Sequence, residues 1–328
     1  MTSIGYALSS EEHPPRDLVA HAVAAERAGF EFALVSDHFH PWIDRQGQSP
    51  FVWSVLGAIA VVTRRLRVGT GVTCPTIRTH PAIIAHAAAT TANMFEGRFF
   101  LGVGTGENLN EHVLGDPWPR YETRREMLIE AVYVMRELWR GELLSHEGAH
   151  YSVENARLYT LPEAPPDIMV AASGKESAQT AGEIGDGLIG TAPNADLVNA
   201  FERGGGNGKP RYGQVTVCWA ANRDEAVRTA HEWWPTSAIP GELSQELALP
   251  RHFEQAAELV TPEKVAESVV CGPDPEQHLA KIHEYADAGF DHIYIHQVGP
   301  DQAGFLRFFE RELLPRAGGV MARASASA

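Results

Sequence analysis

Four side chains that can move protons or contact a ligand follow one short apolar run. Residues 32–35 (Phe-Ala-Leu-Val) show no polar alternation, as expected of a strand buried on both faces, and Asp37, His38, His40 and Trp42 come directly after them. The carboxylate and the imidazoles could act as general acids or bases, and the indole could form the wall of a pocket. The segment therefore predicts a reactive site at the end of a buried strand.

A second polar group follows the apolar residues 99–104. Gly102, Gly104 and Gly106 superficially resemble the dinucleotide fingerprint G-x-G-x-x-G, but the match fails at the third glycine, and the chain lacks the doubly wound pattern that carries this motif. We expect instead that these glycines let the backbone approach a flat ligand. Glu107, just beyond them, is expected to point toward the same site.

The pair His38-x-His40 has a rival interpretation as two ligands of a metal-dependent hydrolase. Such a centre needs further His or Asp ligands from later strands. The expected fifth and sixth strands end in residues 171–173 (Ala-Ala-Ser) and 190–191 (Gly-Thr), which supply neither an imidazole nor a carboxylate. The sequence therefore does not favour metal hydrolysis, and we predict no metal site.

Short apolar segments alternate with helical patterns along the whole chain. The expected strands are residues 4–8, 32–35, 66–75, 99–104, 168–172, 188–191, 215–219 and 292–296. Helical patterns lie at 15–29, 51–63, 81–94, 122–139, 176–184, 197–201, 223–233, 275–289 and 305–314. Eight such strands without a break in composition predict one (β/α)8 barrel, a TIM barrel, over residues 1–316. A hairpin at 143–160 and an irregular helical segment at 235–265 are expected as insertions, Gly204 to Gly206 as a flexible connector, and 317–328 as a disordered tail.

In a (β/α)8 barrel the chemistry lies at the carboxyl ends of the strands. Residues that are distant in the sequence should therefore meet in one pocket, which we expect to contain Asp37, His38, Gly71, Val72, Cys74, Glu107, Asn110, Ser173, Gly174 and Thr191.

Composition limits the classes of partner. Lys and Arg total 27 and Asp and Glu total 42, which gives a formal charge of −15 and argues against nucleic acid and against an anionic membrane surface. The three cysteines, Cys74, Cys218 and Cys271, form no close pair, and the N-terminus has no basic or apolar targeting region. We expect a cytoplasmic protein, with no membrane segment, that acts on a small molecule.

Four motifs make the chain closely resemble the luciferase-like family of flavin and deazaflavin enzymes. They are residues 36–42 (SDHFHPW), 74–78 (CPTIR), 101–111 (LGVGTGENLNE) and 185–187 (GDG). More narrowly, the chain resembles the coenzyme F420-dependent glucose-6-phosphate dehydrogenase group, over about residues 3–316. The resemblance implies a homodimer and a hydride transfer between a substrate carbinol carbon and C5 of the deazaflavin.

The resemblance also implies roles for individual residues. His38 would be the catalytic imidazole, Glu107 would manage the proton at N1 of the cofactor, and Trp42 would stabilise the intermediate. Gly71 and Val72 fall where the family has a non-prolyl cis peptide. Asp37 would contact the cofactor ring, and Asn110, Ser173 and Gly174 fall on cofactor-contacting loops.

The chain departs from the sugar-phosphate enzymes at three positions where they carry positive charge. Asn194, Gln255 and Ser268 stand there, and without cations a phosphate dianion would be held poorly. The resemblance therefore implies F420 as cofactor, with a neutral alcohol, sugar or ketone in the substrate pocket rather than glucose 6-phosphate. FMN in place of F420, as in a monooxygenase or reductase, remains an alternative, as does a non-catalytic cofactor-binding subunit.

Overall fold

The central feature of the structure is a closed barrel of eight parallel strands. The computed structural model describes residues 2–239 and 241–316, so the tail expected at 317–328 lies outside the described residues. Around the barrel the strands are β1 (Ser3–Leu8), β2 (Phe32–Val35), β3 (Arg67–Thr70), β4 (Phe99–Val103), β7 (Asp167–Ala171), β8 (Gly187–Gly190), β9 (Arg211–Cys218) and β11 (His292–Gln297). Pairing of β11 with β1 and of β8 with β9 closes the ring, which confirms the predicted (β/α)8 fold.

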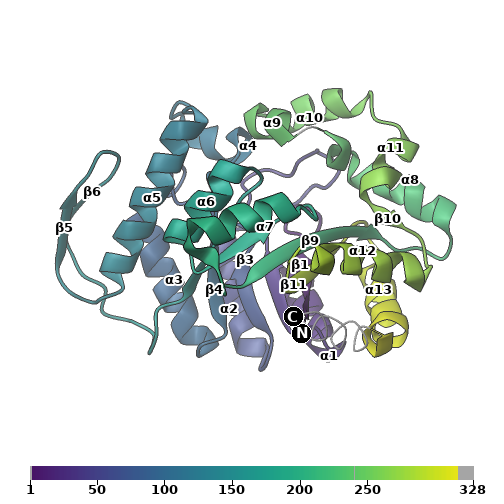
Figure 1. Ribbon diagram of the computed structural model, residues 1–328, viewed down its shortest axis with the longest axis horizontal. Coiled ribbons are helices and arrows are strands. Elements are labelled where there is room, and N and C mark those ends of the chain that lie inside the picture. Colours follow the sequence, from purple (N-terminus) through teal and green to yellow (C-terminus); the bar gives the residue numbers. More distant parts are fainter. Residues whose placement is uncertain (1, 240, 317–328) are drawn as a thin grey trace.

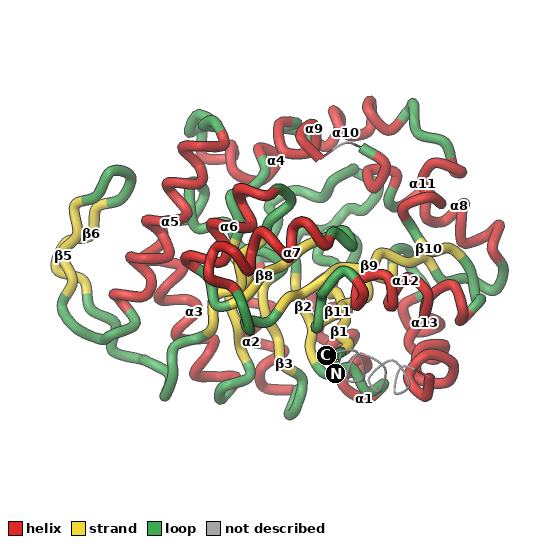
Figure 2. Tube along the Cα trace, viewed as in Figure 1, coloured by secondary structure: helices red, strands yellow, loops and turns green. Residues whose placement is uncertain are grey.

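Helices surround the strands, as Figures 1 and 2 show. They are α1 (Pro15–Arg27), α2 (Val52–Val62), α3 (Pro81–Phe95), α5 (Tyr121–Leu138), α6 (Lys175–Ile184), α7 (Ala195–Phe201), α8 (Arg223–Trp233), α12 (Pro275–Asp287) and α13 (Gln302–Phe308). Local sequence sets their ends: α3 starts at Pro81, with the His80 side chain accepting the Ala82 N–H. Over the part of the chain that the structure describes, no helix combines the length and apolarity needed to cross a membrane.

The apolar core has two layers, because successive side chains of a strand point to opposite faces. Ile293 and Ile295 of β11 belong to the layer between the barrel and the helices. Tyr294, between them, belongs to a second cluster in the barrel interior, with Phe32, Leu34, Phe100, Met169, Ile189 and Tyr212. Because this inner cluster fills the interior of the barrel, a ligand can bind only at the end of the barrel, beyond the cluster.

Two insertions leave the barrel repeat. The predicted hairpin is formed by β5 (Leu144–Glu147) and β6 (Ser152–Ala156), which project at the left of Figure 2. The predicted helical segment consists of η3 (Pro235–Ala238), α9 (Gly241–Glu246), α10 (Pro250–Ala257) and α11 (Pro262–Ser268). In Figure 1, α9 and α10 lie at the top of the molecule, close to α4 (Asn108–Glu111).

Several boundaries differ from the prediction. The strand expected at 66–75 ends at Thr70, and a cis peptide bond joins Gly71 to Val72 just beyond it. Thr73 then resumes contact with β4 through Gly102 and Val103. The cis bond itself lies where the family resemblance placed it.

Other elements escaped the sequence pattern because they are short or polar. β9 starts at Arg211, four residues before the expected 215, and its first residue is held by hydrogen bonds to Asp291 and Glu202 rather than by apolar packing. α4, the following turn η1 (His112–Leu114) and the two-residue β10 (Val270–Cys271) were not predicted. The glycines expected as a flexible connector lie in the segment η2 (Glu202–Gly206), where Gly205 interrupts the helical geometry with a φ of 97°.

Candidate active site

Two adjoining cavities lie at the carboxyl end of the barrel. The inner lobe, of about 230 Å³, is lined by barrel residues such as Leu34 and Tyr294 together with Glu11, His38 and His296. The outer lobe, of about 330 Å³, is lined by loop residues such as Thr105, Gly106 and Ser173. Both lobes share the residues Trp42, Val72, Glu107, Ala171, Ile189 and Thr191. The cleft has the apolar walls and the few convergent polar groups of a small-molecule site.

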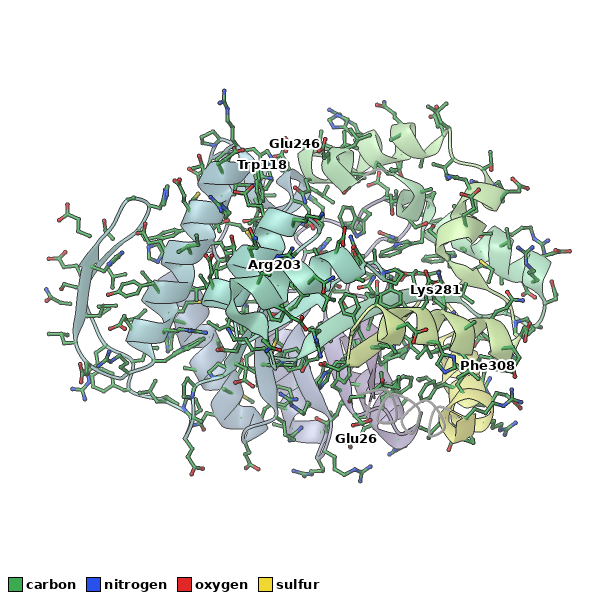
Figure 3. All side chains as sticks on the ribbon, in the orientation of Figure 1. Glu26, Trp118, Arg203, Glu246, Lys281 and Phe308 are labelled. Carbon is green, nitrogen blue, oxygen red and sulfur yellow. The ribbon has the colours of Figure 1, made fainter. Side chains whose placement is uncertain are left out.

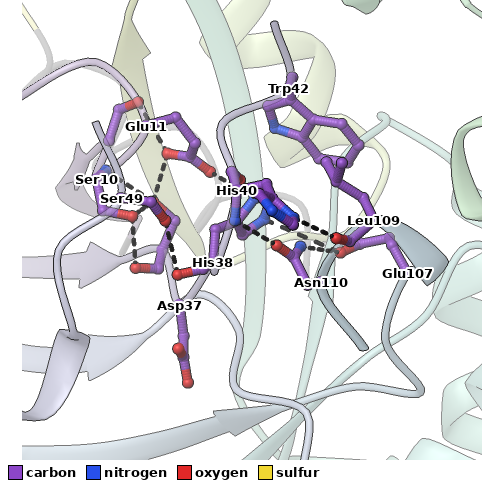
Figure 4. Close-up of polar contacts among 12 residues, drawn as sticks. Ser10, Glu11, Asp37, His38, His40, Trp42, Ser49, Glu107, Leu109 and Asn110 are labelled. Atoms are coloured by element: carbon purple, nitrogen blue, oxygen red, sulfur yellow. Dashed lines mark hydrogen bonds and ion pairs between the residues drawn. The ribbon is translucent and has the colours of Figure 1, made fainter. Parts of the chain in front are cut away.

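His38 lies between two carboxylates, as Figure 4 shows. Its Nδ1 is 3.3 Å from Oε1 of Glu11, and its Nε2 is 3.9 Å from Oε2 of Glu107. Glu11 is buried, whereas the Glu107 side chain is one-third exposed. Since Nδ1 faces only acceptors, Glu11 and the His40 carbonyl, we place the imidazole hydrogen on Nδ1, which leaves Nε2 to accept a proton.

Glu11 is itself held as an anion. Its Oε2 accepts hydrogen bonds from the hydroxyls of Ser36 at 2.6 Å and Ser9 at 3.0 Å. Burial is the largest influence on the pKa of Glu11 and raises it, but the His38 imidazole and the Ser36 hydroxyl outweigh it and hold the pKa below its usual range.

Trp42 packs beside the imidazole and connects it to the helical insertion. The Trp42 and His38 ring centroids are 5.0 Å apart with the planes at 62°, and Phe253 of α10 lies edge-on to the other side of Trp42 at 5.2 Å. Phe253 is fully buried in a small cluster with Ile43 and Leu109. The insertion therefore fixes the indole in the wall of both lobes.

Asn110 holds the loop that carries His38. Its Oδ1 accepts the backbone N–H groups of Phe39 at 2.9 Å and His40 at 3.2 Å, and its Nδ2 donates to Oε2 of Glu107 at 3.3 Å (Figure 4). Asn110 is buried and lines the outer lobe. One amide therefore sets the position of both groups that flank the shared part of the cleft.

Asp37 lines the outer lobe, where its carboxylate pairs with an arginine. Arg78 donates to its Oδ1 at 2.9 Å, and the Thr73 hydroxyl donates to its Oδ2 at 2.8 Å. On its other side Arg78 lies 3.6 Å from Glu111, which also accepts the Arg78 backbone N–H. Burial, reinforced by the nearby Asp37 and Glu107, raises the pKa of Glu111 to about 7 in spite of Arg78.

Of the remaining residues expected around the cofactor, most line one or both lobes and one lines neither. Gly71 lines the inner lobe, Val72 both lobes, and Cys74 and Ser173 the outer lobe. Burial raises the pKa of the Cys74 thiol well above its usual value, so this group is a neutral wall rather than a nucleophile. Gly174 caps α6 and does not line either lobe.

Of the four residues expected around the substrate, one lines the lobes and three do not. Thr191 lines both lobes. Asn194 is exposed and caps α7 by accepting the Leu197 N–H, Gln255 is exposed on α10, and Ser268 lies at the end of α11 with its hydroxyl against Ser237. None of these three lines either lobe in this structure, so their contact with a substrate stays a prediction.

The His40 side chain contacts residues outside the two lobes. Its Nδ1 lies 2.9 Å from the carbonyl oxygen of Leu109, and its ring stacks on His112 at 5.9 Å. Within residues 2–239 and 241–316, no group of three His, Cys, Asp or Glu side chains is arranged to hold a metal ion.

A buried arginine links the helical insertion to α5 at the edge of the outer lobe. Arg124 lies over the Trp118 ring at 4.0 Å from its centroid, and it contacts Gln245 at 3.3 Å and Glu246 at 3.7 Å. Figure 3 shows Trp118 and Glu246 next to each other at the top of the molecule. Gln245 also lines the outer lobe, so this contact shapes its rim.

Sequence reasoning missed three ionisable residues of the inner lobe region: Glu11, Glu12 and His296. A signal was present, because Glu11 and Glu12 follow the first strand and His296 ends the last expected strand, 292–296, at the carboxyl ends where a barrel places its chemistry. Isolated charges near a strand end are common, however, and only the structure shows which of them face the cleft.

Comparisons with known proteins identify the family of the chain. A family model described as luciferase-like monooxygenase matches residues 1–292. An F420-dependent glucose-6-phosphate dehydrogenase of Segniliparus rotundus is 37% identical over 326 residues, and that of Mycolicibacterium gilvum is 38% identical over 327 residues. Each alignment covers 95% of this chain and 97% of the relative.

Solved structures show the same architecture. An F420-dependent secondary alcohol dehydrogenase in complex with an F420-acetone adduct has a TM-score of 0.89 and 30% identity, and covers 95% of this chain and 98% of that one. A coenzyme F420-dependent tetrahydromethanopterin reductase from Methanopyrus kandleri has a TM-score of 0.78 at 22% identity, with coverage of 96% and 99%, and supports the fold alone. With the family model matching most of its length, the chain belongs to the luciferase-like monooxygenase family.

Proposed function

We propose that the protein is an F420-dependent oxidoreductase that interconverts a neutral alcohol and the corresponding carbonyl compound. The observation that carries the proposal is His38, which lines the inner lobe between Glu11 and Glu107, the second of which lines both lobes. The F420-dependent relatives and the structural neighbour with an F420-acetone adduct support the cofactor and the reaction class.

The outer lobe fits a flat heteroaromatic cofactor. Val72, Ala171 and Ile189 give it apolar walls, and the polar groups of Asp37, Asn110, Ser173 and Ser177 stand at its edge. These residues would hold F420, which when bound supplies or accepts the hydride. The inner lobe, with Glu11 and His38, then remains for the substrate.

His38 is proposed as the group that exchanges a proton with the substrate oxygen. Its Nε2 carries a free lone pair and lies 3.9 Å from Glu107, which lines both lobes, while Glu11 fixes the ring and stabilises the imidazolium that forms. Glu107 is exposed enough to pass a proton between the cleft and water, and Asn110 holds its carboxylate in place. The indole of Trp42 excludes water beside the imidazole.

The charges of the cleft favour an uncharged substrate. Neither lobe is lined by any Lys or Arg among the described residues, whereas Glu11 and Glu107 line the inner lobe. Arg78, which contacts Asp37 in the lining of the outer lobe, is already paired with Asp37 and Glu111. A phosphate dianion would meet carboxylates without compensating charge.

A homodimer would cover apolar side chains on two neighbouring helices. Phe51 and Val61 are 63% and 60% exposed at α2, and Ile83 is 60% exposed at α3. A dimer interface would remove these side chains from water, which is favourable for apolar groups. Light scattering coupled to size exclusion should give a mass of twice the 35.8 kDa of one chain. A single species with the mass of one chain would contradict the dimer.

The proposed function is tested by titrating the purified protein with F420, FMN and NADP and following fluorescence quenching. We expect saturable F420 binding, followed by reduction of the bound cofactor when simple secondary alcohols are added. Tight FMN binding without an F420 response would instead support the flavin enzyme. F420 binding without turnover of any alcohol or carbonyl compound would support a non-catalytic subunit.

A further inference from the structure

Two glutamates that are adjacent in the sequence contact histidines on opposite sides of β1. Glu11 and Glu12 follow β1, which pairs with β2 on one side and β11 on the other. Glu11 contacts His38, which follows β2, and Glu12 contacts His296 of β11, with Oε2 at 3.4 Å from Nε2. Both histidines line the inner lobe, so this lobe contains two carboxylate–imidazole pairs, of which the proposed reaction uses one.

His296 faces the inside of the barrel. Ile295 points outward into the helix layer and Tyr294 inward, so strand alternation turns His296 inward, directly above Tyr294. The residue is 3% exposed, and the Trp234 ring stands edge-on against its imidazole at 4.5 Å. This histidine is therefore part of the lobe floor rather than of the outer surface.

The hydrogen bonding of His296 is incomplete. Oε1 of Glu12 accepts the Gly299 backbone N–H at 2.8 Å, which fixes the carboxylate, and its other oxygen faces Nε2 of His296. Nε2 therefore carries the hydrogen, and Nδ1 is left as an acceptor. Nδ1 is buried and has no hydrogen-bond partner among the described residues. A buried polar atom without a partner is costly, so a ligand that supplies a donor here is favoured.

We propose that His296 accepts a hydrogen bond from a second hydroxyl of the substrate, and that the substrate class is a neutral polyhydroxy compound such as a sugar or cyclic polyol. This inference rests on the proposed function. A hydroxyl group is the uncharged donor that matches a neutral imidazole acceptor, and the absence of Lys and Arg from the lobe lining disfavours a phosphorylated form. The indoles of Trp42 and Trp234 supply apolar walls for the carbon skeleton.

The test compares two substrates of nearly equal size on the F420-loaded enzyme. They are cyclohexanols that carry either a hydroxyl or a methyl group on the neighbouring carbon, and only the first can donate to Nδ1. We expect kcat/KM to favour the diol by at least about tenfold, as for a site built to bind a hydroxyl. In the His296→Phe variant, kcat/KM should be about equal for the two substrates. In the His296→Asn variant, which keeps an acceptor, part of the preference for the diol should remain.

His278→Phe is the matched control. His278 is equally buried and also has an unpartnered Nδ1, but its Nε2 faces the Gly272 carbonyl and it does not line either lobe. This variant should keep the full diol preference.

The possible outcomes separate the two proposals. Equal kcat/KM for the two substrates in the unmodified enzyme, or a diol preference that survives His296→Phe, would overturn the polyol inference and leave the F420 reaction in place. Absence of F420 binding would overturn both. If His296→Phe does not fold, the comparison of the two substrates in the unmodified enzyme still decides.

Discussion

Oε1 of Glu11 lies 3.3 Å from Nδ1 of His38, although 27 positions separate the two residues in the chain. Both follow adjacent parallel strands, β1 and β2, whose carboxyl ends are in register. A buried carboxylate behind an imidazole fixes the tautomer and stabilises the protonated ring. This relationship supports the proposal that His38 is the proton-transfer group of the cleft.

Glu11→Gln should therefore lower kcat by about 10- to 100-fold, the usual effect of removing a group that orients a functional histidine. The reason is that the charged Glu11 carboxylate fixes the orientation and tautomer of the His38 ring, and a neutral amide is a weaker acceptor. Steady-state kinetics measure kcat. Glu31→Gln, an exposed carboxylate just before β2, is the control. A kcat that is unchanged in Glu11→Gln would exclude the role.

His38→Ala and Glu107→Gln should each abolish turnover while leaving F420 affinity within about tenfold, or ~1.4 kcal/mol. The reason is that both side chains are assigned to proton transfer rather than to holding the ring. Fluorescence titration gives the affinity, and anaerobic reduction of F420 gives the turnover. Near wild-type turnover in either variant would show that the proton takes another route.

Glucose 6-phosphate should be a negligible substrate, although the curated relatives named here act on it. Each charge-assisted contact contributes roughly 1.5–3 kcal/mol, and the cleft offers no Lys or Arg among the described residues that line it. Neutral alcohols should be turned over better with the same cofactor. A kcat/KM for glucose 6-phosphate above ~10⁴ M⁻¹s⁻¹ would mean that a cation reaches the site from outside the observed lining.

Glu111→Gln should change how stability depends on pH. Burial raises the pKa of Glu111 from 4.5 to about 7, so the folded state binds this proton more tightly than the unfolded state. The stability associated with the group is complete below pH 4.5 and is lost as the pH rises through 7. The variant, neutral at every pH, should gain stability relative to the unmodified protein between pH 5 and pH 8.

Thermal melts at the two pH values measure this difference. Glu122→Gln, at an exposed position of α5, should show no such gain. If the difference in Tm between Glu111→Gln and the unmodified protein were the same at both pH values, Glu111 would have an ordinary pKa, with its burial fully offset by Arg78.

Apolar periodicity alone was sufficient to predict the eight barrel strands, because a parallel strand that is buried on both faces must be apolar along its length. The same rule indicated where chemistry would lie, since all strands of a barrel end on one side. His38, Trp42 and Glu107 do meet there. Short or polar elements such as α4 and β10 gave no such pattern, because tertiary contacts hold them.

What only the tertiary structure decided is which polar groups face the cleft and which are already paired. Asn194 caps a helix and lines neither lobe, whereas Asp37 lines the outer lobe, and Glu11 and His296 line the inner lobe. The sequence determined the fold and the end of the barrel that carries the site, because burial of strands and helices requires apolar residues at regular positions along the chain. The partners of individual polar side chains follow no such pattern, since each depends on two segments brought together by folding.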